Sequence, residues 1–233
     1  GNAWYKTNAY NSGFYGIYLK IGTSGQSNVQ GNTIQNISWS NATYAGFYGI
    51  CIDAGAVNVG TTAGNKIGSN AGNGSIFYQN GLGGGLYGIY TSGNAVTTIE
   101  NNEIGSITSA STNSGYPSSI FGIYISSGTP TIKGNTIGST TTANSIIASS
   151  ASTSNAQYVY GIYSNSTTSA IIQNNIIANL TNGTTNTSTA IAGLINGIFC
   201  FSGTNTITNN IIRDLTISNA NNSSTHTASV SGI

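Results

Sequence analysis

Charged residues are almost absent from this chain. Among its 233 residues, five are Lys or Arg and four are Asp or Glu, which gives a formal net charge of +1. Proteins that bind nucleic acid or anionic membranes gather basic residues into patches or stripes, because phosphate groups must be neutralised locally. The five basic residues here are scattered instead, at Lys6, Lys20, Lys66, Lys133 and Arg213. The sequence therefore predicts no nucleic-acid partner.

Long hydrophobic runs are also missing. No stretch of about 18 apolar residues occurs, so we expect no insertion into a bilayer. The opening "GNAWYKTNAY" lacks the basic start and apolar core of a secretory signal. The chain also contains no Met. We therefore expect either a mature product or a segment of a longer protein.

Gly, Asn, Ser and Thr are abundant, and they occur in a repeat. The dipeptide Gly-Ile returns in "FYGIYL", "FYGICI", "LYGIYT", "IFGIYI", "VYGIYS" and "INGIFC", and a seventh copy, "VSGI", ends the chain. Successive glycines lie 33 to 39 residues apart. Ile, Val, Thr, Tyr and Phe dominate these modules, which favours strands over helices. Period-2 alternation then predicts an inward column at Ile17, Ile50, Ile89, Ile123, Ile162 and Ile198.

A second module follows each Gly-Ile module and has the pattern I-x-x-N-x-I-x-x-I. Its three-residue steps do not fit a straight strand, so we expect a bend at the Asn. Gly or Asn also precedes this Asn, and both residue types accept left-handed backbone angles. Stacked corners would let the amides hydrogen-bond to one another as an internal ladder. The predicted ladder residues are Asn32, Asn65, Asn102, Asn135, Asn175 and Asn210.

Together, these modules resemble the right-handed parallel β-helix repeat of the pectate-lyase-like β-solenoid superfamily. The resemblance covers residues 14–233 and implies an all-β solenoid of about six coils of 33–39 residues. We expect residues 1–233 to form a single domain, or an uncapped segment of a longer β-helix. The Ser/Thr/Asn-rich segments, such as residues 140–158, are expected to be long loops with a third strand inside each.

The family includes polysaccharide lyases and hydrolases, which use clustered acids. Here the four acids, Asp53, Glu100, Glu103 and Asp214, fall in different coils or on either side of a predicted bend. Such spacing does not suit two carboxylates that share one cleft. His226 has no acidic or Cys cluster beside it. We therefore predict no catalytic, metal or cofactor-binding residue and no cofactor, so that lyase or hydrolase activity is only a remote alternative.

The two cysteines are predicted to be unbridged. Cys51 falls at an outward strand position, whereas Cys200 falls at an inward one four coils away. At a strand spacing of roughly 4.8 Å this separation is about 19 Å, far beyond the limit of about 7 Å for a disulfide. We expect Cys200 to be a buried thiol and Cys51 to be an outward one.

The outward face of the Gly-Ile modules predicts an aromatic column. Its members are Tyr18, Tyr90, Tyr124, Tyr163 and Phe199. Strict alternation adds a flanking outward column at Phe14, Phe47, Leu86, Ile120, Val159 and Ile195. Three interpretations stay open: loops cover this face as a second core, another protein binds it, or glycans stack on it.

These patterns favour a structural protein outside the cell. We expect an extracellular or cell-surface building unit of a filament, sheath or fibre that stacks end to end with copies of itself, since open coil ends propagate such contacts. The alternative is a cell-surface β-helix, such as an adhesin, that binds or cleaves carbohydrate. Cell-surface glycans are then its partners.

Overall fold

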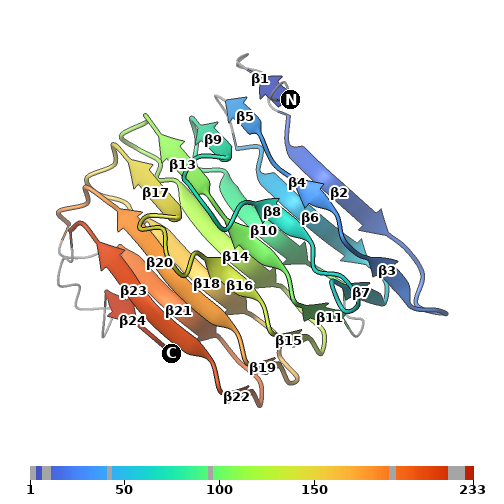
Figure 1. Ribbon diagram of the computed structural model, residues 1–233. Helices are drawn as coiled ribbons and strands as arrows, with labels where there is room; N and C mark the ends of the chain where they lie inside the picture. The colour runs from blue at the N-terminus through green and yellow to red at the C-terminus, as the bar shows by residue number, and fades with distance from the viewer. Residues whose placement is uncertain (1–3, 7–11, 41–43, 94–96, 189–192, 220–228) are drawn as a thin grey trace.

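The computed structural model describes residues 4–6, 12–40, 44–93, 97–188, 193–219 and 229–233. Within these ranges all regular elements are β-strands, and their pairings are parallel. Figure 1 shows successive coils side by side in the order of the chain, from blue at one end to red at the other. The predicted all-β parallel solenoid of six coils is confirmed.

Three sheets form the walls of the solenoid. The Gly-Ile sheet contains β2 (Phe14–Lys20), β6 (Phe47–Ala54), β10 (Gly85–Thr91), β14 (Ser119–Ile125), β18 (Tyr158–Ser164), β21 (Leu194–Cys200) and β24 (Val230–Ser231). The short sheet contains β3 (Ser27–Val29), β7 (Val57–Val59), β11 (Thr97–Glu100), β15 (Thr131–Lys133), β19 (Ile171–Gln173) and β22 (Thr206–Thr208).

The third wall, the broad sheet, consists of two runs of strands. The first run contains β4 (Thr33–Ile34), β8 (Lys66–Gly68), β12 (Glu103–Gly105) and β16 (Thr136–Gly138). The second contains β1 (Trp4–Lys6), β5 (Ile37–Ser40), β9 (Ile76–Asn80), β13 (Ile107–Ser111) and β17 (Ile146–Ser150). Both runs meet in β20 (Ile176–Gly183), which pairs with β23 (Ile211–Ile217). The strand predicted within residues 140–158 is β17, so that expectation is confirmed.

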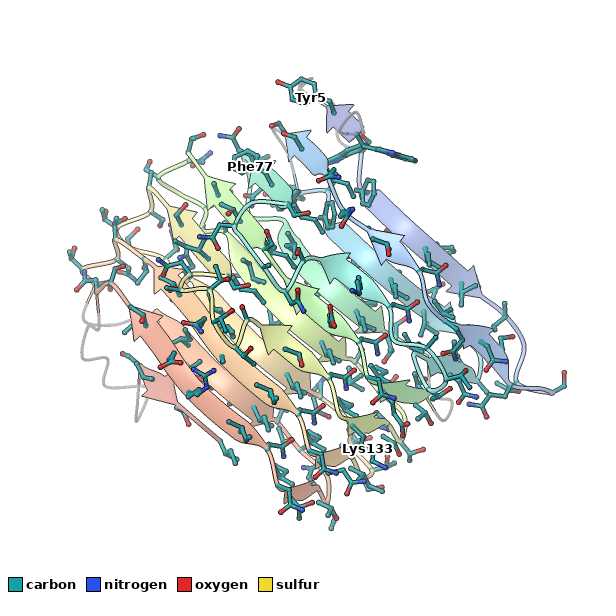
Figure 2. All side chains as sticks on the ribbon, viewed as in Figure 1. Tyr5, Phe77 and Lys133 are labelled. Atoms are coloured by element: carbon teal, nitrogen blue, oxygen red, sulfur yellow. The ribbon has the colours of Figure 1, made fainter. Side chains whose placement is uncertain are left out.

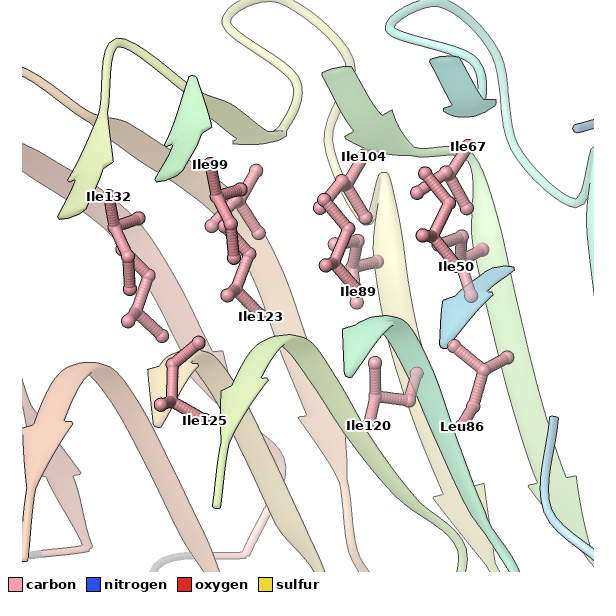
Figure 3. Close-up of a cluster of buried hydrophobic side chains, with 14 of the residues drawn as sticks. Ile50, Ile67, Leu86, Ile89, Ile99, Ile104, Ile120, Ile123, Ile125 and Ile132 are labelled. Atoms are coloured by element: carbon pink, nitrogen blue, oxygen red, sulfur yellow. The ribbon is translucent and has the colours of Figure 1, made fainter. Parts of the chain in front are cut away.

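The core lies between the walls and consists mainly of isoleucine columns (Figure 3). Ile50, Ile89 and Ile123 are register partners in the Gly-Ile sheet, and each is fully buried. Ile104 of the broad sheet and Ile99 of the short sheet face them across the interior. Full burial of one such side chain stabilises the fold by about 1.5–3 kcal/mol.

The predicted flanking outward column was wrong. Phe14, Phe47, Leu86, Ile120, Val159 and Ile195 are buried in the core. The strict alternation fails at the glycine of each module, because the residue two before it and the residue after it both point inward. A side chain at Gly88 has no room, since its Cβ would lie 2.5 Å from the Gly122 carbonyl oxygen and 2.8 Å from Cγ2 of Ile104.

The predicted corners and the amide ladder are both present. The residue before the ladder Asn takes a positive φ in five of the six coils, for example 57° at Asn101 and 65° at Gly134, and Gly64 before Asn65 is the exception. Asn65, Asn102, Asn135 and Asn175 have no exposed surface. The ladder also binds backbone groups at the corner. In every coil after the first, Nδ2 of the ladder Asn donates to a carbonyl oxygen, as Asn135 does to Ile99 at 2.9 Å.

Candidate functional site: the aromatic face

Two columns of rings lie on the outer surface of the Gly-Ile sheet, and together we call them the aromatic face. The first column takes the position before the glycine and consists of Tyr15, Tyr48, Tyr87, Phe121 and Tyr160. The second column takes the position two after the glycine and consists of the predicted Tyr18, Tyr90, Tyr124, Tyr163 and Phe199. Cys51 stands between Tyr18 and Tyr90 in the second column.

Rings within a column stack with nearly parallel planes. Tyr15 and Tyr48 have centroids 4.8 Å apart and an interplanar angle of 3°, and Tyr124 and Tyr163 are 4.8 Å apart at 9°. Contacts between the columns are edge to face, for example 5.3 Å and 72° between Tyr87 and Tyr90. Both geometries are favourable for aromatic pairs. The ring faces are therefore occupied by other rings along the column, and mainly edges and hydroxyl groups point outward.

Exposure differs along the face. Tyr15 and Tyr18 in the first coil are 48% and 49% exposed, whereas Tyr160 is 6% exposed. Tyr90, Tyr124 and Tyr163 are half-buried. The loops within the described ranges therefore do not cover the face as a second core. The interpretations of a protein interface and of a glycan surface stay predictions.

Burial raises the pKa values of these phenols further above neutral pH. Desolvation raises the pKa of Tyr48 to about 12, with a smaller contribution from neighbouring Tyr15. Desolvation also raises the pKa values of Tyr87 and Tyr160 well above the ordinary tyrosine value. The aromatic face is thus uncharged at neutral pH, apart from one carboxylate at its first end.

That carboxylate belongs to Asp53. Its Oδ2 accepts a hydrogen bond from Tyr18 Oη at 3.0 Å and lies 3.1 Å from Lys20 Nζ, while its Oδ1 accepts one from Ser92 Oγ at 3.0 Å. The bond from Lys20 is the largest cause of a lowered Asp53 pKa, followed by those from Tyr18 and Ser92. The Asp53 bond is also the main cause of a raised Tyr18 pKa, because it holds the phenolic proton in place.

An open groove of about 390 Å³ lies near the last coils of the aromatic face. Its lining comprises Tyr87, Phe121, Tyr124, Tyr158, Tyr160, Tyr163, Leu194, Phe199 and Phe201. The first column ends here, because the register partner of Tyr160 is Asn196 instead of a ring. Phe201 is 68% exposed. The groove offers apolar rings and phenol hydroxyls without any carboxylate or basic group.

The cysteines are free, as predicted, but their exposure differs from the prediction. Cys51 shares the outward register of Tyr90, yet it is only 4% exposed because the rings of the neighbouring coils surround its short side chain. Desolvation raises its pKa to about 11. Cys200 packs against the core on the inward side, as expected, but is only half-buried because it lies in the last complete coil.

Three of the four acidic residues, Asp53, Glu103 and Asp214, form separate ion pairs. Lys66 Nζ lies 3.6 Å from Glu103 Oε2, and Arg213 pairs with the adjacent Asp214. Among the described residues, no three His, Cys, Asp or Glu side chains form a group that suits a metal ion, and no helix is long and apolar enough to cross a membrane. His226 lies outside the described residues.

The first aromatic column was missed by the sequence interpretation. Its members precede the glycine directly, and they recur as Tyr, Tyr, Tyr, Phe and Tyr in the first five modules. This recurrence was a usable signal. It was overlooked because simple alternation places the residue before the glycine on the inward side.

Comparison with known proteins gives no relative. No protein-family model matches the chain, and no curated protein or solved structure shows significant similarity to it.

Proposed function

We infer that the protein is a structural unit of an extracellular filament, sheath or surface fibre, built on the right-handed parallel β-helix that its repeats resemble. End-to-end stacking of its coils on further copies is the mechanism. One observation carries this proposal. Core side chains that are completely buried in the inner coils are partly exposed at the equivalent positions of the first and last coils within the described residues.

At the first end, Ile17 and Leu19 of β2 are partly exposed. Their register partners one coil further in, Ile50 and Ile52, are fully buried. The environment of a core position thus changes between the first and second coil. A further coil placed against β2 would bury this apolar surface.

The last coil also exposes part of its core. Leu215 and Ile212 of β23 are partly exposed, whereas their partners Leu180 and Ile177 are fully buried. Ile211 and Ile233 are 53% and 71% exposed. Burial of apolar area drives association at about 25 cal/mol per Å² before its costs are subtracted.

The strand edges support the same joint. Within the described residues, β2 pairs only with β6, and β24 pairs only with β21. Unpaired edges of parallel strands are templates for another chain. In the proposed joint the Gly-Ile sheet runs on from β24 of one copy to β2 of the next, and the broad sheet runs on from β23 to β1. Such a head-to-tail contact does not close on itself and therefore produces a filament.

Electron microscopy of the purified protein tests this function. We expect rods whose coil spacing continues from one subunit to the next. Leu215→Lys places a charge on the open end of the core and should leave folded single particles. Thr216→Lys is the matched control, because Thr216 is exposed in the same strand. Wild-type protein that stays monomeric at high concentration, or rods that persist in Leu215→Lys, would contradict the proposal.

A second candidate function is binding of neutral carbohydrate, which the groove beside Phe199 favours. Sugar rings stack on aromatic faces, and here the free faces lie where the first column ends. Phe201, which is 68% exposed, offers such a face, and the half-buried Tyr158 lines the groove beside it. A glycan array compares the wild type with Phe201→Ala and, as control, Tyr44→Ala outside the groove. Equal binding by all three proteins, or none, would exclude this site.

A further inference from the structure

The phenol rings of the aromatic face form an unbroken chain along the solenoid. The ring of Tyr18 lies 5.3 Å from that of Tyr15, which is stacked at 4.8 Å on Tyr48. From Tyr48 the chain branches to Tyr87 at 4.9 Å and Tyr90 at 5.4 Å. It continues at 5.3, 4.8 and 5.3 Å through Tyr124, Tyr163 and Tyr160. Each tyrosine is therefore in contact with the next over five coils.

Such a chain can conduct an oxidising equivalent. Rings in contact exchange electrons readily, because their π orbitals overlap. A phenol that loses an electron becomes a very strong acid, and the oxidised state is stabilised only where its proton has an acceptor. The hydrogen-bond partner of each hydroxyl therefore determines which tyrosine is oxidised to a stable radical.

Tyr18 has the acceptor. Among the described hydrogen bonds of the two columns, only that of Tyr18 leads to a carboxylate, at 3.0 Å to Asp53 Oδ2. Lys20 and Ser92 hold the Asp53 carboxylate in place from other sides. Tyr18 is also 49% exposed, so another molecule can reach its ring.

We propose that the tyrosine chain is a redox relay that ends at Tyr18, and that Tyr18 is a site of oxidative dityrosine coupling between two molecules. The co-reactant is a one-electron oxidant, such as a peroxidase intermediate or a photo-oxidised ruthenium complex. This proposal does not depend on end-to-end assembly, because its readout is a covalent change at one residue.

Coupling of two Tyr18 residues consumes two one-electron oxidants. Each of two oxidants takes one electron, and each Tyr18 hydroxyl proton passes to Asp53, which leaves two neutral phenoxyl radicals. The radicals join through one ortho carbon each, so that one carbon–carbon bond forms. The two ring hydrogens at those carbons then move as protons to the phenolic oxygens, which restores both aromatic rings. In total two phenols lose two electrons and two protons.

A tethered oxidant distinguishes relay from direct attack on Tyr18. In the chain with Cys200→Ser and Thr204→Cys, a ruthenium tris-bipyridyl complex is attached at position 204 in the sixth coil, five strand spacings or about 24 Å along the axis from Tyr18. Thr204 is exposed, and the remaining Cys51 is buried. Light with persulfate generates the oxidant, and mass spectrometry of peptides measures dityrosine at Tyr18.

We expect Tyr18 to be the main coupled residue, and Tyr18→Phe to abolish the linked dimer. The Tyr48→Phe/Tyr87→Phe double variant retains the rings but removes the phenols that connect Tyr15 to the later coils, so the Tyr18 yield should fall at least five-fold. The control is Tyr5→Phe/Tyr44→Phe, which removes phenols that are 72% and 60% exposed outside the columns, and the yield should be unchanged. Figure 2 shows Tyr5 on β1 at the first end of the solenoid.

Far-UV circular dichroism verifies that each variant has the parent fold. An unreacted Tyr18 in the tethered parent would overturn the proposal. An equal Tyr18 yield in the parent and in Tyr48→Phe/Tyr87→Phe would overturn it as well, because the relay would then have no role.

Discussion

Asn102 accepts two hydrogen bonds from Asn65 through a single oxygen. Its Oδ1 lies 3.0 Å from the backbone nitrogen of Asn65 and 2.8 Å from Nδ2 of the same residue. Asn102 in turn donates from both of its own nitrogens to Oδ1 of Asn135, at 2.9 Å each. The ladder therefore has a direction, and each rung fixes the distance and register of the next coil.

Asn102→Ala should lower the free energy of unfolding by about 2–5 kcal/mol, since it leaves the buried backbone N–H of Asn65 without an acceptor and removes one of the two acceptors of Asn65 Nδ2. Urea denaturation followed by circular dichroism measures the change. Asn58→Ala is the control, because the half-buried Asn58 makes its side-chain hydrogen bonds at the surface, donating to Asn28 at 3.2 Å and accepting from Gln26 at 2.7 Å. Its effect should stay within about 0.5 kcal/mol. Equal losses of unfolding free energy in both variants would show that the buried ladder stabilises the fold no more than the surface amides do.

Gly88→Ala should destabilise the fold by about 1–3 kcal/mol, since a methyl group there must displace the backbone of the next coil. Gly25→Ala is the matched variant, because no atom lies within 4 Å of its added Cβ. That change should be neutral or slightly stabilising. Thermal unfolding of the two variants beside the wild type measures the difference, and a Gly88→Ala protein as stable as the wild type would exclude the close approach at Gly88.

The free energy of unfolding lost when a core isoleucine is truncated should be larger in the middle of the solenoid than at its ends. Ile123→Ala removes a fully buried side chain and should cost about 2–5 kcal/mol. Ile212→Ala, at a partly exposed core position of the last coil, should cost clearly less in the monomer. Urea denaturation at low protein concentration compares them. If both variants lose the same stability, the last coil is as well covered as the middle one.

The sequence predicts the architecture well because every coil solves the same packing problem. Repeated Ile, Gly and Asn at fixed offsets determine the strands, the corners and the ladder. Period-2 reasoning failed at the glycine, because a residue without a side chain lets the strand turn two nearby residues inward. The burial of Cys51 could not be predicted either, since it depends on large rings in the coils on both sides.

Only one of the two columns of the candidate site was predicted from the sequence. Tyr90 and Tyr124 were expected in an outward column, and their register is as predicted. Whether such rings offer their faces or their edges depends on rotamers, and these are set by stacking on the neighbouring coil. The Tyr18 to Asp53 bond joins residues of two coils 35 positions apart, and no local pattern indicates it.

Alkaline pH should destabilise the protein through its tyrosines. Burial raises the pKa of Tyr48 to about 12, whereas an unfolded tyrosine titrates near 10. As the pH rises above about 10, the unfolded chain loses phenolic protons that the folded chain retains, so the free energy of unfolding must fall. Absorbance of tyrosinate at alkaline pH should therefore increase together with loss of the circular dichroism signal. Tyr48→Phe keeps the ring stack and removes one of these phenols, so its stability should decline less steeply between pH 10 and 12. An identical slope in Tyr48→Phe and in the wild type would show that Tyr48 ionises as freely in the folded state as in the unfolded one.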